Sequence, residues 1–340
     1  MLTDLEIQNA FLFLLGRRPS DGECQDWKNA CDDVDGLRAG LKQTDEWIQS
    51  TLAELSTVGK KDHLGIFFCH IPRAGGTLLD QLFREAKGIP PLSLSPALLR
   101  KMKSIHGSQA KEALLKWTYL KGHTSVFWAP KGFKVVSNWR DPFSRFISEY
   151  VWLASSRVRS FVRASSHAED LYLPWPIWFD SFEEYVDRKF ERMREGTVAW
   201  QFSIETADIE SFMKLSQPEK KDSIVRGLEM VDAMGNFNVL SSYLQVAELP
   251  TTFPLTRENH VRGTSEVRPN SAQVGPETTE KLESLLSWDL WVENQAMRQD
   301  LLPKRQEEVT HPYLNELFAQ HGISLPDSFA DRVLGAAEKI

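Results

Sequence analysis

A basic residue, two glycines and a threonine follow one another where an apolar run stops, and together they could hold an anion. They lie within residues 72–77, which read PRAGGT. Gly75 and Gly76 let backbone N–H groups approach an oxyanion closely, and a helix that starts here adds partial positive charge. Thr77 can cap that helix or donate a hydroxyl hydrogen bond. Arg73 supplies a full charge, so the segment predicts an anion site, although a plain strand–helix turn is the alternative.

A second group of positive charges surrounds Arg140. Residues 131–163 contain seven Lys and Arg against two acidic residues, a net +5 inside a chain of net −7. Arg140 ends an apolar run, and Pro142 suits the first turn of a helix that would carry Ser144 and Ser148 on one face. Ligands of open α/β sheets bind at the carboxyl ends of strands. Arg140 and Ser148 are therefore candidates for a second anionic group, and a solvated basic helix is the alternative.

A histidine between the two segments is the candidate general base. His123 lies in Lys121–Phe127 (KGHTSVF), and an unperturbed histidine pKa near 6.5 suits proton abstraction from a hydroxyl at neutral pH. A hydrogen-bonded structural role is equally open. His70 belongs to an apolar run and is expected to orient the loop that follows it, whereas Glu149 and Asp80 are the carboxylates to consider next.

The elements that must position these residues alternate between strand and helix. Leu64–Ile71 and Phe133–Trp139 are near-continuous apolar runs, as in strands buried on both faces. Each is followed by a turn and a helical pattern, which predicts an α/β domain with a parallel sheet covered by helices. From Phe179 onward the pattern is mostly helical, with one further strand expected at Thr252–Leu255.

Residues 1–55 form a separate helical unit in this reading. Apolar residues recur at helical spacing from Leu5 to Leu15, residues 16–22 (GRRPSDG) break the pattern, and two further helices are expected over Glu23–Ala30 and Val34–Leu41. The string LGRRPSDG with the later DEW resembles a small helical module appended to bacterial glycan-modifying and surface proteins. Its expected role is packing, homo-oligomerisation or partner binding, and a linker at Ser56–Asp62 separates it from a domain spanning residues 62–340.

The two charged segments together resemble a known enzyme family. The string FCHIPRAGGT resembles the phosphosulfate-binding motif of sulfotransferases that use 3'-phosphoadenosine 5'-phosphosulfate, most closely the carbohydrate branch that includes heparan sulfate 2-O-sulfotransferases. The pattern R-D-P-x-x-R-x-x-S-x-Y from Arg140 to Tyr150 resembles their 3'-phosphate motif. The resemblance implies a P-loop-like three-layer fold, a saccharide or other hydroxyl acceptor, and adenosine 3',5'-bisphosphate as product.

Roles for individual residues follow from that resemblance. Arg73, Ala74, Gly75, Gly76 and Thr77 would hold the 5'-phosphosulfate, and Arg140 and Ser148 the 3'-phosphate. The G-H-x-x-x-F string is similar to the segment with the base histidine in some of these enzymes, which implies that His123 is catalytic. Arg262 would close a C-terminal loop over the nucleotide.

This sequence departs from the family at position 73, where lysine is usual. Arginine retains the charge and makes bidentate contacts but donates a proton poorly, so Arg73 is assigned an electrostatic catalytic role. Arg145 and Tyr150 are expected to be structural, with Arg145 pairing with Asp141 or packing the helix. Trp175 and Trp178 could offer indole faces to a sugar or could anchor a flap.

The composition disfavours several classes of binding partner. A pI near 5.7 disfavours general adhesion to nucleic acid, and the six-residue apolar run Ala10–Leu15 is far shorter than a bilayer span of about 20 residues. The three cysteines do not form a disulfide framework, which favours a cytoplasmic protein. The spacing of His, Cys and Asp indicates no metal site.

Two other functions remain open at this stage. A nucleotide-dependent kinase would share the fold, but residues 72–77 do not match G-x-x-x-x-G-K-[ST]. A non-catalytic module that binds nucleotide or glycan would tolerate the arginine at position 73.

Overall fold

The computed structural model describes residues 2–15, 17–41, 44, 46, 65–76, 92–94, 98–99, 112, 114–115, 117–154, 179–235, 272–303 and 312–340. The chain divides into two compact units: residues 1–63, 95–117 and 160–176 form one, and residues 64–94, 118–159 and 177–340 form the other. Among the described helices, none is long and apolar enough to cross a membrane.

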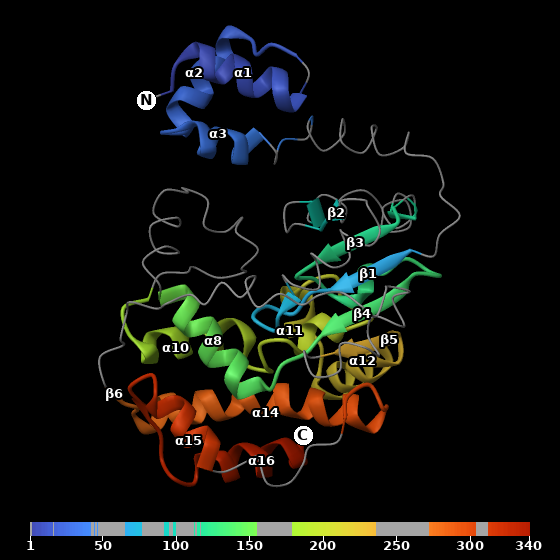
Figure 1. The fold of residues 1–340 in the computed structure, drawn as a ribbon, viewed down its shortest axis with the longest axis vertical. Helices are drawn as coiled ribbons and strands as arrows, with labels where there is room; N and C mark the ends of the chain where they lie inside the picture. Colours follow the sequence, from blue (N-terminus) through green and yellow to red (C-terminus); the bar gives the residue numbers. More distant parts are fainter. Residues whose placement is uncertain are drawn as a thin grey trace, which may run out of the picture. The chain divides into compact units, whose positions relative to one another are not determined.

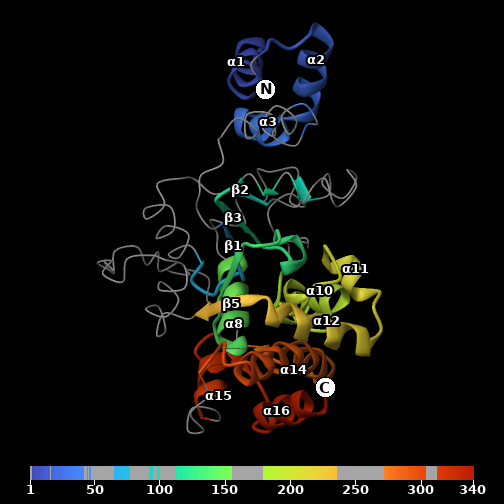
Figure 2. The same ribbon diagram turned by 90° about the vertical axis from the view of Figure 1, so that its right-hand side faces the viewer.

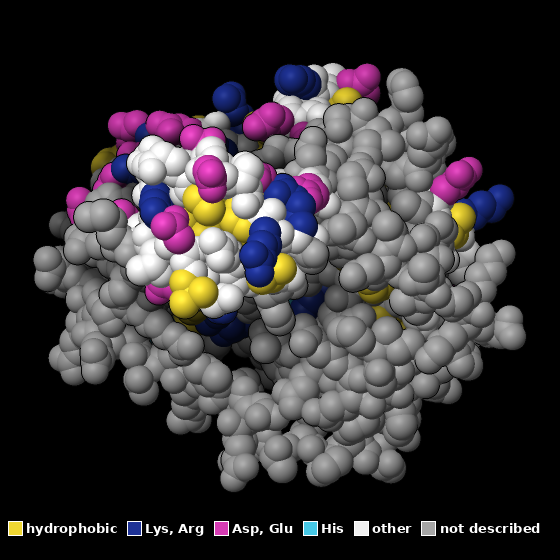
Figure 3. Space-filling view, turned by 90° about the horizontal axis from the view of Figure 1, so that it is seen from above, with side chains coloured by type: hydrophobic (Ala, Val, Ile, Leu, Met, Phe, Trp, Pro, Cys, Tyr) yellow, Lys and Arg dark blue, Asp and Glu magenta, His cyan; other side chains and the backbone are white. Residues whose placement is uncertain are grey.

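Three helices make up the described elements of the first unit: α1 (Asp4–Leu15), α2 (Asp21–Ala30) and α3 (Val34–Leu41). Their buried core contains Ile7, Phe11, Leu37 and Leu41. Helix α2 begins two residues before the predicted start because Ser20 and Glu23 form a capping box. On the face shown in Figure 3, acidic and basic side chains of the described residues are interspersed rather than gathered by sign.

A five-stranded sheet forms the centre of the second unit (Figure 1). Its strands are β1 (Ile66–Cys69), β2 (Leu92–Ser93), β3 (Tyr119–Gly122), β4 (Lys134–Asn138) and β5 (Val231–Gly235). The order is β2-β3-β1-β4-β5, and every neighbouring pair is parallel. All four residues of β1 are buried, as the apolar run predicts. The predicted α/β class and parallel sheet are confirmed.

Helices flank this sheet. They are α8 (Pro142–Ala154), α10 (Phe182–Met193), α11 (Ile209–Met213), α12 (Gln217–Glu229), α14 (Pro276–Arg298), α15 (Pro312–Ala319) and α16 (Phe329–Lys339), with the 3-10 turns η1 (Val126–Trp128) and η3 (Ala199–Phe202). In Figure 2, α11 and α12 lie to one side of the strands, and α14 packs along α16. A two-stranded parallel sheet, β6 (Ala272–Gln273) with β7 (Ile323–Ser324), completes the unit.

The sequence prediction missed three strands of the large sheet, β2, β3 and β5. Beyond Phe179 it placed a strand only at Thr252–Leu255, which lies outside the described residues. The structure instead adds β5, five residues directly after α12. Strand β5 (VDAMG) lies at the edge of the sheet, and Asp232 interrupts its apolar residues. Asp232 is exposed, and its carboxylate accepts from the Val135 amide and the Lys134 ammonium of the neighbouring strand.

Candidate functional site

The two predicted anion-binding segments meet at the topological switch point of the sheet. Strands β1 and β4 are neighbours. The chain leaves β1 toward β2, on the far side of β3, whereas it leaves β4 toward β5 on the opposite side. The connections therefore diverge, and the crevice between them is where open α/β sheets bind ligands. Arg73 follows β1 and Arg140 follows β4, so both arginines belong to this crevice.

The turn after β1 has the backbone shape of an anion cradle. Within residues 72–76, φ is positive only at Arg73 (61°) and Gly75 (85°), so its sign alternates along the turn. Alternating right- and left-handed residues direct successive N–H groups into one concavity that suits an anion. Arg73 is not a glycine, and a left-handed conformation there is strained, as is common at binding sites.

An asparagine fixes the entry to this turn. Asn138, the last residue of β4, is buried and makes two bonds to Ile71: its Oδ1 accepts from the Ile71 amide at 2.8 Å, and its Nδ2 donates to the Ile71 carbonyl at 2.9 Å. Both bonds join the segment after β1 to the end of β4, at the point where the two connections diverge. Asn138 therefore sets where the cradle starts relative to Arg140.

Gly76 has a packing reason for its lack of a side chain. A Cβ at this position would overlap the imidazole ring of His70. His70 thus packs directly against Gly76, and its role in orienting the loop stays a prediction. Thr77 lies outside the described residues, as do Asp80, Trp175, Trp178 and Arg262.

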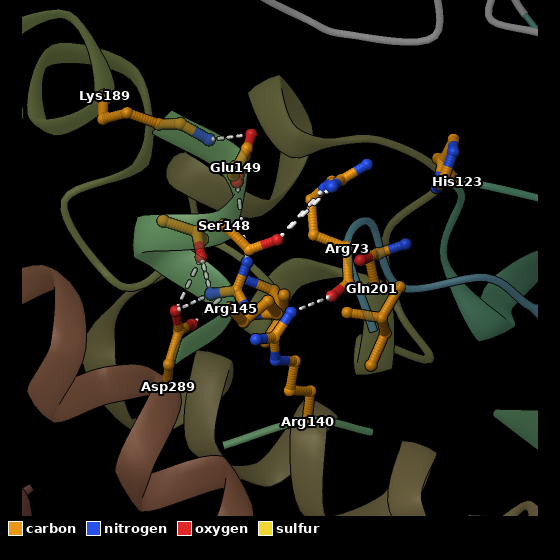
Figure 4. A network of polar contacts seen from close by, with 12 residues as sticks. Arg73, His123, Arg140, Arg145, Ser148, Glu149, Lys189, Gln201 and Asp289 are labelled. Atoms are coloured by element: carbon orange, nitrogen blue, oxygen red, sulfur yellow. Dashed lines mark hydrogen bonds and ion pairs between the residues drawn. The ribbon is translucent and has the colours of Figure 1, made fainter. Parts of the chain in front are cut away.

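Arg73 is held by weak contacts to neutral groups (Figure 4). Its Nε and Nη2 lie 3.4 Å from the Ser148 hydroxyl, and its guanidinium stands over the Trp152 indole, 5.3 Å from the ring centre. Arg140 donates to the Arg73 carbonyl at 3.4 Å. Burial lowers the pKa of Arg73, and the charge of Arg140 lowers it further. A guanidinium nevertheless stays charged at neutral pH, so the crevice concentrates positive charge.

Helix α8 begins at this crevice because Asp141 caps it. The Asp141 carboxylate accepts from the Phe143 amide at 3.1 Å and from the Ser144 amide at 3.0 Å. Ser148 is one of only three residues on α8 that are not buried. The capped start fixes α8 so that Ser148 faces Arg73.

Helix α8 also carries a buried ion network, next to Ser148. Arg145 donates to Asp289 at 2.6 Å and also bonds to Thr197, while Glu149 accepts from Lys189 at 2.6 Å and lies 3.7 Å from Arg145. The prediction that Arg145 pairs with Asp141 is wrong, because Asp141 caps the helix and Asp289 of α14 takes the guanidinium. Glu149 is engaged by two cations, which disfavours it as a replacement for His123 as base, whereas Asp80 lies outside the described residues.

The hydrogen bond of His123 fixes its tautomer. Its Nδ1 lies 2.7 Å from the His70 carbonyl oxygen, which only accepts, so Nδ1 carries the proton. In the neutral ring Nε2 is then the nitrogen that can accept a proton. The two imidazoles also pack together, with ring centres 4.3 Å apart. Burial lowers the pKa of His123, while the bond to the His70 carbonyl opposes that shift, so the ring is neutral near pH 7.

A glutamine from far along the chain completes the support of His123. Gln201 of η3 is buried and donates from Nε2 to the same His70 carbonyl at 3.2 Å. Sequence reasoning missed Gln201 because 131 residues separate it from His70 and no motif surrounds it. It also missed Asn138, although an amide residue two positions before Arg140, at a strand end, was a usable signal.

The remaining described groups offer little other chemistry. Burial raises the pKa of the Cys69 thiol to about 12, so Cys69 is a poor nucleophile at neutral pH. Among the residues that the structure describes, no group of three or more His, Cys, Asp or Glu side chains could hold a metal ion. No protein-family model, curated protein or solved structure matches the chain.

Proposed function

We propose that this chain is a cytoplasmic sulfotransferase that moves a sulfuryl group from 3'-phosphoadenosine 5'-phosphosulfate to the hydroxyl of a saccharide. One observation carries the proposal: a turn of alternating φ, two arginines and a serine converge at the switch point of a parallel sheet. The sequence motifs assign a donor with two separated anionic groups to the same residues. A cradle with cations from two strand ends fits such a donor.

The assignment of residues follows the two strand ends. The backbone N–H groups of residues 74–76 and the Arg73 guanidinium would hold the 5'-phosphosulfate, with Thr77 beside them. Arg140 and Ser148 would hold the 3'-phosphate, and Arg262 would close over the nucleotide. The fold is P-loop-like in this proposal, because the glycine turn directly follows the central strand β1 and occupies the position of a phosphate loop. When bound, the donor supplies an activated sulfuryl group.

His123 acts as the general base. Its Nδ1–H is held by the His70 carbonyl, so Nε2 accepts the proton of the attacking hydroxyl. Arg73 stabilises negative charge that develops on the sulfuryl oxygens without giving up its proton. Since the residues are already oriented by Asn138, Gln201 and the Asp141 cap, positioning and electrostatics supply most of the acceleration.

The N-terminal helices would serve as an appended module. We assign residues 1–55 to packing, oligomerisation or partner binding, and residues 62–340 to the catalytic domain. Among the residues of α1 whose burial is described, Leu5 (65%) and Leu12 (46%) are exposed leucines seven residues apart on one helix face. This face would be the contact surface of the module.

A transfer assay tests the function directly. Purified protein is incubated with 3'-phosphoadenosine 5'-[³⁵S]phosphosulfate and a panel of oligosaccharides and small hydroxyl compounds. Label should appear on a saccharide, and His123→Ala should abolish it. Binding of ATP with Mg²⁺ in preference to adenosine 3',5'-bisphosphate would indicate a kinase instead. Tight bisphosphate binding with no transfer to any acceptor would indicate a non-catalytic module.

A further inference from the structure

Helix α8 presents a narrow accessible stripe beside the cradle. Ten of its thirteen residues are buried, and the other three are Ser148, Val151 and Trp152. Their spacing of three and four residues places them on one helix face. The same face contacts Arg73 at two points, through the Ser148 hydroxyl and the Trp152 indole. The stripe therefore borders the proposed reaction centre.

Trp152 is unusual on this stripe because it is large, apolar and exposed. Its exposed fraction is 37%, and within the described residues of the sheet-containing unit it is the one large hydrophobic side chain in the exposed class. An indole offers a large apolar face with a polar N–H at its edge, and such rings are enriched at binding interfaces.

The position of Trp152 favours a contact with the acceptor substrate rather than with the nucleotide donor. It lies one helical turn beyond Ser148, about 6 Å farther from the strand ends along α8. The donor occupies the inner cradle at the strand ends, so an acceptor that attacks in line approaches from the outer side of Arg73. The indole borders that outer side.

We propose that Trp152 is a stacking platform for a saccharide ring of the acceptor. An indole face attracts the slightly positive C–H groups on one side of a pyranose, while the ring hydroxyls stay free at its rim. Stacking would place one such hydroxyl beside Arg73 and the sulfuryl group. This inference rests on the proposed function and adds a residue that selects sugar rings as the substrate class.

The test uses fluorine NMR on the full-length chain labelled with 5-fluorotryptophan. The chain has eleven tryptophans, and Trp152→Phe identifies the resonance of Trp152 by its disappearance. The probes are adenosine 3',5'-bisphosphate alone, then heparosan, chondroitin and cellulose hexasaccharides with and without the bisphosphate. The Trp152 resonance should shift with a hexasaccharide and respond much less to the bisphosphate.

Affinity measurements on variants complete the test. Trp152→Ala should weaken saccharide binding by roughly tenfold or more, while bisphosphate affinity stays within about threefold. Trp152→Phe should recover part of the loss, and Leu115→Ala, which removes an exposed apolar side chain outside the sheet-containing unit, should change neither affinity.

Three results would contradict the role of Trp152 as a stacking platform. A Trp152 resonance that follows the bisphosphate, or a Trp152→Ala variant that loses both affinities together, would overturn the proposal and assign the indole to the adenine or to holding Arg73. A resonance that no hexasaccharide moves would also overturn it. Failure to bind the bisphosphate would instead contradict the proposed function. The titration with saccharide alone still tests Trp152, because it does not depend on bound nucleotide.

Discussion

Two groups of cations lie against helix α8, and their partners differ. Arg145 and Lys189 are buried and bond at 2.6 Å to the carboxylates of Asp289 and Glu149. Arg73, on the accessible side of the helix, makes hydrogen bonds of 3.4 Å to the neutral hydroxyl of Ser148, and Arg140 reaches a backbone carbonyl at the same distance.

The difference separates charges that maintain the fold from charges suited to a ligand. A buried cation requires a close anion, because an uncompensated charge in the interior is strongly unfavourable. At the crevice, long contacts to neutral oxygens are easily exchanged for contacts to an incoming phosphate or sulfate. Substitutions in the buried network and at the crevice should therefore change different measured quantities.

The largest effect is expected at His123. Its replacement by alanine should reduce turnover by roughly 10²–10⁴-fold, since the group that accepts the hydroxyl proton is lost. Bisphosphate affinity and melting temperature should change little. Turnover, calorimetric titration and thermal unfolding measure the three quantities. If turnover survives, another group is the base.

The buried network should respond through stability. Arg145→Leu leaves Asp289 and Glu149 without their shared cation and should lower the free energy of unfolding by about 3–5 kcal/mol. Arg188→Leu removes a surface ion pair of α10 and is the matched control, with an expected change below about 1 kcal/mol. Urea unfolding compares them. Equal changes in the two variants would contradict the structural role of Arg145.

Arg73 should show the reverse behaviour. Arg73→Ala should lose roughly 10²-fold in turnover with little loss of stability, because an electrostatic contact to the reacting group disappears. Arg73→Lys should keep most activity or exceed the wild type, since lysine can also donate a proton. An alanine variant with full activity would exclude Arg73 from catalysis.

The smallest effect concerns pH. His123 must be neutral to accept a proton, so the rate rises as pH passes upward through its pKa. Burial lowers that pKa, which places the ascending limb below the ordinary value of about 6.5. A pH–rate profile measures it, and the limb should vanish in any residual activity of His123→Ala. A wild-type limb above 6.5 would contradict the buried, neutral imidazole.

The sequence was informative where local pattern determines structure. The apolar runs located β1 and β4, and the glycines and charges after them located the turn and the start of α8. Strands β2, β3 and β5 were not predicted, because none of them has a continuous apolar run. The partner of Arg145 escaped for another reason: Asp289 is 144 residues away, and only the packing of α14 against α8 brings them together.

In the candidate site, too, local motifs identify some residues, whereas others are brought in only by long-range packing. Motifs identified Arg73, Gly75, Gly76, Arg140, Ser148 and His123. The bonds that orient them come from residues without motifs, since Asn138 and Gln201 act through backbone carbonyls and amides that no side-chain pattern records. The placement of Thr77 and Arg262 stays a prediction.

The central claim is that the crevice between β1 and β4 recognises a nucleotide with a 3'-phosphate. Calorimetric titration of the wild type and Arg140→Ala with adenosine 3',5'-bisphosphate and adenosine 5'-phosphate tests it most directly. The wild type should bind the bisphosphate much more tightly. Arg140→Ala should lose about 1.5–3 kcal/mol of binding free energy for the bisphosphate and little for the monophosphate, because only the former carries the group that Arg140 contacts. Equal losses for the two ligands, or equal wild-type affinities, would contradict the claim.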